Sequence, residues 1–355
     1  MHDVIALEAG LAPAAAALGA RTRALHLPAN RRPWLGTGLR LRRGQSYTLI
    51  VSGRIGWSAR HPHLHGGPGF HLWARVAPGG RIVNVTRDSG SFVADVDGEL
   101  ELGIYLGMWR DEQGALDTPQ QAYDRLAGAL DVLVLAWPGS AAHGLDTLLP
   151  THAAPALVAE RERLAAAVTP PSGWDYLVET GSSDIWRACG APGDGRICLD
   201  AHDDQGIIRT ALDLPLTPET TLAWRWRLDE HPSSKAEDST LSHDYVSIAL
   251  EFDDGRDLTW IWSSCLPLEH HFACPIRAWS ARETHLVVRS GLAEAGRWLE
   301  ERRNVHADVA RAIGTPPKRI VAAWLIAVAT FQHGRARAAF EGIRVLQPGL
   351  CHDVR

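Results

Sequence analysis

The sequence contains few sulfur-bearing residues and no cysteine pair with the CxxC spacing of many metal sites. Besides two methionines it has five cysteines: Cys189, Cys198, Cys265, Cys274 and Cys351. An odd number of cysteines without a zinc-binding pattern favours reduced thiols and a cytoplasmic location. A hairpin could bring Cys189 to Cys198, or Cys265 to Cys274, so a disulfide stays open as the alternative.

Excess positive charge, long apolar runs and an export signal are also missing. The formal net charge is −5, which gives no electrostatic support to general nucleic-acid binding. Apolar runs such as 320–331 are shorter than the roughly 20 residues that cross a bilayer. The first residues, MHDVIALEAG, include acids where a secretion signal is basic. We therefore expect neither nucleic acid nor membrane as a partner, whereas a homo-oligomer remains open.

Familiar catalytic signatures are missing as well. The sequence contains no P-loop, GxGxxG turn, HExxH helix or nucleophile elbow. What it does contain is tryptophan, at 14 of its 355 positions. Tryptophan is favoured on half-buried sheet surfaces and at sites where a ring stacks on a ligand. With 45% hydrophobic and 22% charged residues, the composition is that of a globular protein long enough for two domains.

Residues 33–140 are predicted to form a β-sandwich. Segments such as GLRLRRGQSYTLIVSG and SFVADVDGELELGIYLG alternate apolar and polar residues, and glycine-containing turns separate them. Short strands at regular spacing, with no helix between them, are typical of a sandwich or jelly roll. Residues 1–32 show no firm pattern and are interpreted as an N-terminal extension.

Residues 141–172 are predicted to be a short helical linker, because APALVAERERLAAAV has helical composition and two prolines follow it. The strand pattern returns over 173–348, and 349–355 is interpreted as a tail. Within this region Asn304 is a good N-cap for one helix. The predicted fold class is all-β, with two tandem jelly-roll-like β-sandwiches joined by the helical linker.

Part of the N-terminal half resembles the PA-IL-like galactose-binding lectin family in strand order and in the positions of glycine and tryptophan. The segments that carry this resemblance are GLRLRRGQSYTLIVSGRIGWS, GGPGFHLWARVAPGGRIVNV and ALDVLVLAW. The resemblance implies a sandwich that binds galactosides through calcium held in loops near its last strands. The loop after Tyr105 departs from the family's run of Asp, Thr and paired Asn. Its carboxylates suit calcium, but at another spacing, and Trp109 is a candidate ligand-binding residue beside them. These acids are Asp111, Glu112, Asp117 and Asp124.

The segment WSARHPHLHGGPGFHLW concentrates histidine within the same region. His61, His63 and His65 would share one face of an extended strand, since successive side chains alternate. Together with His71 they are a candidate site for zinc or another transition metal. The alternative is an exposed loop whose histidines bond locally, which the neighbouring proline and glycines favour.

The segments LAWRWRL, SHDYVSIALEFD, LTWIWSS and GRWLEERRNVHADVARAIGTPP resemble the DUF3047 family of uncharacterised bacterial proteins. The resemblance covers roughly 172–346 and implies a fold but no activity. One departure is VATFQHGRARAAF, which stands where such proteins usually carry an acid-rich segment.

The stretch from Trp224 to Trp262 holds the candidate site residues of the C-terminal half. Histidine beside a carboxylate suits general acid–base chemistry, so the candidate catalytic residues are His231, His243, Asp244 and Tyr245. Glu251 and Asp253 of EFDDGRD do not complete a glycosidase signature, and Asp253-Asp254-Gly255 is better explained as a hairpin turn. Rings and arginines suit saccharide recognition; the candidate ligand-binding residues are Trp224, Arg225, Trp226, Trp260 and Trp262, with His270 and Trp109.

The function expected from the sequence is recognition of a carbohydrate or glycan-like small molecule, with a divalent metal, zinc or calcium, left open. One alternative is an enzyme, a hydrolase, lyase or biosynthetic tailoring enzyme, with its site in the C-terminal sandwich. Another is a scaffold without catalysis. The polar connection between Glu230 and Tyr245 is long for a sandwich, and long ordered loops are often functional.

Overall fold

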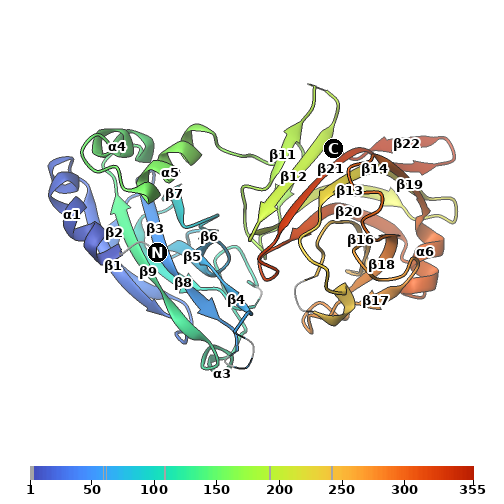
Figure 1. Ribbon diagram of the computed structural model, residues 1–355, viewed down its shortest axis with the longest axis horizontal. Coiled ribbons are helices and arrows are strands. Elements are labelled where there is room, and N and C mark those ends of the chain that lie inside the picture. Colours follow the sequence, from blue (N-terminus) through green and yellow to red (C-terminus); the bar gives the residue numbers. More distant parts are fainter. Residues whose placement is uncertain (1–3, 59, 61, 108, 192, 241–242) are drawn as a thin grey trace. The chain divides into compact units, whose positions relative to one another are not determined.

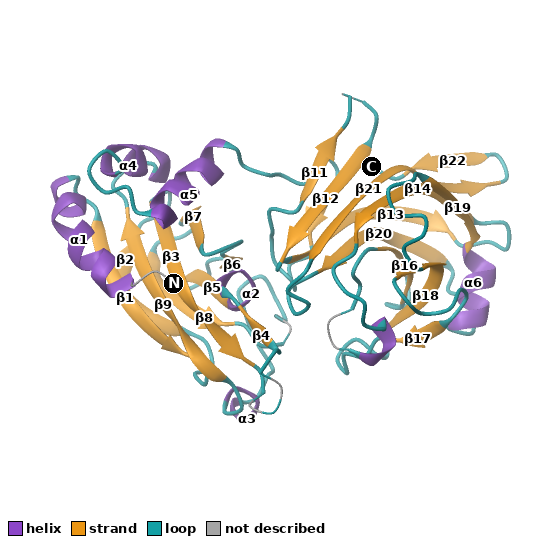
Figure 2. Ribbon diagram, in the orientation of Figure 1, coloured by secondary structure: helices purple, strands orange, loops and turns teal. Residues whose placement is uncertain are grey.

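The computed structural model describes residues 4–58, 60, 62–107, 109–191, 193–240 and 243–355. The chain forms two compact units. Unit 1 comprises residues up to Ala167 together with Val178–Ser183, and unit 2 comprises Val168–Leu177 and Asp184–Arg355. Strands dominate each unit (Figures 1 and 2), so the fold is all-β, as predicted.

Unit 1 is a sandwich of two sheets. The five-stranded sheet has the order β1-β9-β3-β4, with β7 also paired to β3, and the four-stranded sheet has the order β2-β8-β5-β6. The strands are β1 Arg21–Pro28, β2 Leu35–Leu41, β3 Ser46–Gly56, β4 His65–Gly66, β5 Leu72–Ala77, β6 Val83–Asn84, β7 Ser89–Val93, β8 Gly98–Ile104 and β9 Ala127–Ala136. The helices are α1 Val4–Ala17, α2 Pro68–His71, α3 Gln120–Tyr123, α4 Ala141–Leu148 and α5 Pro155–Ala165.

Apolar side chains on both faces of β3 and β9 explain where the helices pack. One face, including Leu49 and Val134, lies in the core between the sheets. The other face carries Ile50, Leu133 and Leu135, which α1, α4 and α5 cover. The helices of the expected extension and of the expected linker are therefore parts of unit 1, which ends at Ala167 within the linker. β1 is an edge strand that pairs along its length with β9. No described helix is long and apolar enough to cross a membrane.

Unit 2 is a larger sandwich. Its seven-stranded sheet has the order β10-β13-β20-β15-β16-β18-β17, and its six-stranded sheet has the order β11-β12-β21-β14-β19, with β22 also paired to β21. The strands are β10 Asp175–Tyr176, β11 Trp186–Cys189, β12 Arg196–His202, β13 Gln205–Pro215, β14 Thr221–Glu230, β15 Ser247–Phe252, β16 Asp257–Ser263, β17 His271–Ala273, β18 Glu283–Ser290, β19 Leu299–Asn304, β20 Arg319–Val328, β21 Arg335–Gln347 and β22 Leu350–Asp353. The helices are α6 Val305–Ala312 and a 3-10 turn at Glu237–Ser239.

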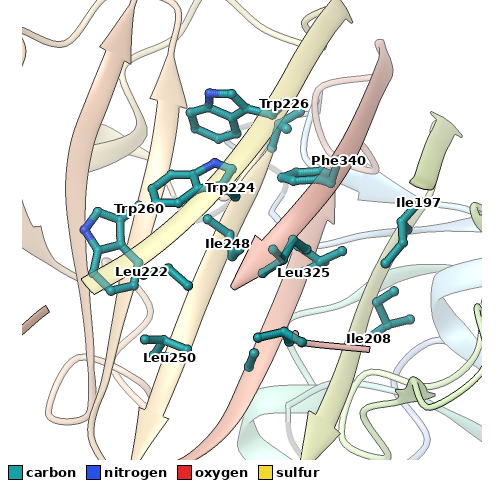
Figure 3. Close-up of a cluster of buried hydrophobic side chains, with 14 of the residues drawn as sticks. Ile197, Ile208, Leu222, Trp224, Trp226, Ile248, Leu250, Trp260, Leu325 and Phe340 are labelled. Carbon is teal, nitrogen blue, oxygen red and sulfur yellow. The ribbon is translucent and has the colours of Figure 1, made fainter. Parts of the chain in front are cut away.

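Tryptophan fills the core of unit 2 because alternation along β14 and β16 directs Trp224, Trp226, Trp260 and Trp262 between the two sheets. Figure 3 shows three of these rings among aliphatic side chains. Each of the four is at most 1% exposed, so none offers a ring face to a ligand. The prediction that they bind a ligand is wrong for this reason, whereas the predicted sharing of faces is confirmed.

Two local predictions in unit 2 are confirmed and one is wrong. Asp253 and Asp254 lie in the turn between β15 and β16, and Asn304 caps α6 by accepting the Ala307 N–H at 2.8 Å. The cysteines are not all reduced. Cys189 and Cys198 form a disulfide across the β11–β12 hairpin, because their strands pair antiparallel and bring the two positions to neighbouring places in the ladder.

Candidate functional site

A buried polar cluster lies on the face of the seven-stranded sheet that points away from the tryptophan core. Strands β16 and β18 run parallel here and pair Asp257 with Glu283 and Thr259 with His285. Side chains two residues apart share a face of a strand. The side chains of Glu283 and His285 therefore lie on one face of β18, and that of Leu286 lies on the other face, in the core.

The long connection before β15 adds the remaining members of the cluster. His243 Nε2 lies 3.3 Å from Asp244 Oδ2 and 4.0 Å from Glu283 Oε2. Asp244 Oδ1 lies 2.6 Å from His285 Nε2. Asp244 has a positive φ of 58°, a conformation that aspartate adopts more readily than most residues. The cluster of His243, Asp244, Glu283 and His285 brings four possible metal-ligand atoms within 4.8 Å of one another.

Two further side chains border the cluster. Cys274 Sγ lies 3.2 Å from His243 Nε2, and this cysteine is a buried thiol rather than a disulfide partner of Cys265. The Phe272 ring stacks on the His285 imidazole with centroids 4.8 Å apart and planes 10° apart. His270 in turn stacks on Phe272 and pairs with Asp238 at 3.1 Å. Aromatic contact thus fixes the orientation of the His285 ring.

Burial and mutual charge shift the pKa values within the cluster. Burial and then the negative charge of Asp244 raise the pKa of Glu283 to about 7. Burial alone would lower the pKa of His285, but Asp244 and Glu283 outweigh it and raise that pKa to about 9. Burial would raise the pKa of Asp244, yet the two histidines hold it below its usual value. The site therefore favours positive charge at its centre.

Asp257 lies beside the cluster in the same sheet. Burial, followed by repulsion from Glu283, raises the pKa of Asp257 well above its usual value. Its Oδ1 accepts a hydrogen bond from Thr259 at 3.2 Å, while its Oδ2 and the Nδ1 of His285 are both buried without a hydrogen-bond partner. Such orphaned atoms are costly.

The four candidate catalytic residues are only partly brought together. His243 and Asp244 belong to the cluster, whereas the His231 ring contacts Tyr245 with centroids 5.1 Å apart. The two His231 nitrogens lie 2.6 Å from the Ser233 carbonyl and 3.2 Å from the Trp262 carbonyl. Burial lowers the pKa of His231 and raises that of Tyr245. His231 and Tyr245 therefore hold the connection before β15 against the sheet.

The other residues expected to bind a ligand in unit 2 are engaged by neighbouring side chains of the protein. Arg225 bonds Glu341 at 2.5 Å and lies 5.4 Å from the Trp298 ring, on the outer face of the six-stranded sheet. His270 belongs to the stack described above. The sequence did not indicate Glu283, His285, Cys274 or Asp257 as site residues. The pattern Glu283-Thr284-His285 on a strand, which places an acid and an imidazole on one face, was the signal that could have found them.

Of the four histidines expected to bind metal in unit 1, the three that the structure describes do not form a metal-ligand group. His61 lies outside the described residues, and His63 sits in an exposed turn. His71 is fully buried, with Nε2 accepting from Trp57 Nε1 at 3.1 Å and Nδ1 at 2.9 Å from the Tyr105 carbonyl. Among the residues that the structure describes, neither His65 nor the others join a group of three metal ligands.

The loop acids that suit calcium have other partners. Asp111 accepts the N–H groups of Gln113 and Ala115, which closes a turn. The remaining acids bond charged or amide neighbours: Glu112 to Arg81, Asp117 to Arg110 and Asp124 to Gln120. Trp109 is 2% exposed and stacks on Trp34 with centroids 5.0 Å apart. The loop thus contributes a small aromatic core rather than an open ligand surface.

A second candidate site is an open hollow in unit 1 with a cavity volume of about 760 Å³. Four exposed arginines line it against one acid, Asp97, and no lining side chain is aromatic. They are Arg21, Arg40, Arg42 and Arg43. This arginine hollow lies where the start of β1, the β2–β3 turn and the start of β8 meet.

The chain is thus a two-sandwich, all-β protein with an arginine hollow and a buried His–acid cluster. Residues 178–344 match the model of DUF3047, a family of proteins of unknown function, and the resemblance predicted for the C-terminal half is confirmed. No curated protein matches the chain.

Two solved structures are similar to part of the chain. The N-terminal domain of EclA, a PllA-like lectin, is 16% identical and aligns over 32% of this chain and 95% of its own, with a TM-score of 0.26. The xyloglucanase domain of NopAA, a type three effector from Sinorhizobium fredii solved with cellobiose, is 10% identical over 50% of this chain and 94% of its own, with a TM-score of 0.30. At TM-scores of 0.26 and 0.30, neither likeness decides the fold or the function of this chain.

Proposed function

We propose that the chain recognises an acidic, saccharide-like small molecule in the arginine hollow of unit 1. The observation that carries this proposal is the lining of the hollow, which sets four arginines against one acid. A guanidinium group presents a planar fork of donors that matches carboxylate, sulfate or phosphate. A ligand with at least one such group is therefore favoured.

The backbone around the hollow is fixed by hydrogen bonds. The Arg43 N–H donates to Asp97 Oδ1 at 2.7 Å, and Gln45 Nε2 donates to the Trp137 carbonyl at 3.1 Å. Arg21 also donates to the carbonyl of Arg40. Gly44, with a φ of 84°, allows the tight turn that carries Arg42 and Arg43. Such a frame holds the arginines near one another before a ligand arrives, which reduces the entropy lost on binding.

The size and lining of the hollow favour a polyhydroxylated ligand body. A volume of about 760 Å³ lies within the range of small-molecule pockets and exceeds what one inorganic anion fills. A flat aromatic base would be expected to stack on a ring, and the lining provides none. The charged side chains of the lining instead suit hydroxyl groups. A uronic acid or a sulfated sugar combines both features.

Binding to the full chain can be measured by calorimetry with uronic-acid and sulfated oligosaccharides, beside neutral galactosides. We expect acidic ligands to bind with an affinity that falls as salt increases, and Arg40→Ala and Arg42→Ala to weaken binding. Arg81→Ala is the matched control, because Arg81 is an exposed arginine of unit 1 outside the hollow that pairs with Glu112. The proposal fails if no acidic ligand binds, or if binding is indifferent to Arg40 and Arg42.

The alternative of an enzyme in the C-terminal sandwich would rely on the buried cluster. Its side chains are sealed: His243 is 3% exposed and Asp244 9%, while Glu283 is 7% exposed and His285 0%. A substrate could reach them only if a neighbouring segment moved. Burial of this kind favours a role in holding the fold together.

A further inference from the structure

We propose that His243, Asp244, Glu283 and His285 bind one divalent transition-metal ion inside unit 2. The proposal is independent of the arginine hollow, which belongs to unit 1. It places the metal far along the chain from the histidines between residues 61 and 71 that the sequence pattern favoured for metal binding. The ion would join the connection before β15 to strand β18.

The spacing of the ligand atoms fits a metal ion. Four ligands about 2.1 Å from a metal lie about 3.4 Å apart in a tetrahedron and up to about 4.2 Å apart in an octahedron. His243 Nε2 lies 3.3 Å from Asp244 Oδ2 and 4.0 Å from Glu283 Oε2. His285 Nε2 lies 3.7 Å from Glu283 Oε1. Small rotations of these side chains would bring all four atoms to bonding distance.

The donor set selects the kind of ion. Two imidazole nitrogens with two carboxylates suit zinc, iron or another transition metal, whereas calcium and magnesium prefer oxygen ligands alone. The buried thiol of Cys274, 3.2 Å from His243 Nε2, adds a donor that calcium would not use. Four protein ligands in a sealed site are typical of a structural centre rather than a catalytic one, which keeps a position open.

The balance of buried charge provides a second, independent reason. Counted as whole residues, Asp244, Glu283 and Asp257 are each at most 6% exposed, and the acids outnumber the two histidines among these buried groups. Burying an uncompensated carboxylate is costly, so such groups are paired or coordinate metals. A divalent cation would satisfy Asp244 and Glu283 directly. The proton between Asp244 Oδ1 and His285 Nε2, 2.6 Å apart, would leave as the metal binds.

Asp257 supplies the support that metal-binding histidines usually have. A histidine that binds metal through Nε2 commonly donates its Nδ1–H to a carboxylate or carbonyl. In unit 2 the Nδ1 of His285 and the Oδ2 of Asp257 are both buried and unpartnered, and the two residues belong to paired strands. Asp257 is therefore the positioning residue for His285. Its substitution by Asn should lower metal affinity by about 10- to 100-fold.

Metal content of the full chain, purified without an affinity tag, tests the proposal directly. Elemental analysis should find a stoichiometric transition metal as purified, or after dialysis against Zn²⁺, Fe²⁺ or Mn²⁺, and the metal found identifies the ion. His243→Ala and His285→Ala should each lose it. His270→Ala is the matched control, because His270 is a half-exposed histidine near the cluster that pairs with Asp238; this variant should keep its metal.

A thermal measurement on the wild-type chain avoids the risk that a variant fails to fold. Removing the metal with a chelator should lower the Tm of unit 2 by about 5–10 °C when free metal had exceeded its Kd a hundredfold, and adding the metal back should restore it. With Co²⁺ in place of the native metal, a sulfur-to-cobalt band that disappears in Cys274→Ser would make Cys274 a fifth ligand. Absence of stoichiometric metal before and after dialysis, together with a Tm indifferent to chelator, overturns the proposal.

Discussion

Each unit buries a histidine completely, and the two are held in opposite ways. His71 of unit 1 lies against the rings of Trp57 and Phe70, and burial lowers its pKa to about 4. His285 of unit 2 lies among acids that raise its pKa to about 9. Desolvation acts on both rings alike. The neighbouring charges decide the outcome, so the His71 ring is kept neutral whereas the acids favour the protonated form of the His285 ring.

The same contrast separates the two candidate sites. The arginines of the hollow are exposed, so their charges remain hydrated and are free to exchange water for an anion at modest cost. The acids of unit 2 are buried, where water cannot compensate them. An exposed cluster of one sign suits reversible recognition, whereas buried carboxylates are paired with a cationic side chain or coordinate a metal ion.

The largest expected effect comes from breaking the tryptophan core of unit 2. Trp260→Ala should reduce the free energy of unfolding of unit 2 by about 3–5 kcal/mol, because it opens a large cavity and removes the hydrogen bond from Trp260 Nε1 to Asp308 at 2.9 Å. Scanning calorimetry measures the loss. Unchanged stability combined with lost ligand binding would instead show that the ring serves a ligand.

Acid should weaken unit 1 through His71. Because folding lowers its pKa from 6.5 to about 4, the unfolded chain takes up the proton first as the pH falls. The contribution of His71 to stability is complete above pH 6.5 and is lost between pH 6.5 and 4, at a cost of about 3 kcal/mol. Urea unfolding across this range should be less steep in pH for His71→Gln, which keeps a donor and an acceptor but cannot titrate. An identical pH profile for both proteins would refute the assignment.

Reduction should affect unit 2 alone, since all five cysteines have numbers above 188. The disulfide between Cys189 and Cys198 closes a loop with a sequence separation of 9. Loop-closure entropy then predicts that Cys198→Ser lowers the free energy of unfolding by about 2–3 kcal/mol. Cys265→Ser is the control, because Cys265 is free and exposed, and it should change stability by less than about 0.5 kcal/mol. Equal effects of the two substitutions would argue against the bond.

The smallest expected effect is on the hollow. Arg40→Ala should weaken binding of an acidic oligosaccharide about tenfold, as expected for one lost charge-assisted hydrogen bond, and should leave the Tm of both units almost unchanged. The affinity of Arg40→Lys should lie between those of the wild-type chain and Arg40→Ala, because lysine keeps the charge but not the fork of donors. Calorimetric titration separates these values. A fall in Tm that accompanies the lost affinity would point to a structural role.

Much of the fold could be predicted from the sequence, because alternation along strands and local capping are short-range signals. The faces of the tryptophan strands and the Asn304 cap are examples. The partners that cover each face depend on long-range packing, which is why residues 21–28 were not recognised as an edge strand. Tryptophans on one face of a strand suit a core and a ligand surface equally well, and only burial distinguishes them.

For the same reason, only half of the candidate site could be predicted from the sequence. His243 and Asp244 are adjacent in sequence and stood out, whereas Glu283 and His285 come from a strand about 40 residues later that pairs in parallel with β16. Crossover connections of this kind leave no periodic signal between the strands they join. The arginine hollow gathers three segments in the same way, and no one of them is unusual alone.

The most direct test of the proposed metal centre is hydrogen exchange of the full chain with and without a metal chelator. Removal of the ion should increase amide exchange in 243–263 and 283–290, because the bound metal joins these segments, and should leave the strands of unit 1 unchanged. Exchange in both segments that is identical with and without chelator, in protein shown by elemental analysis to have lost its metal, would contradict the proposed centre.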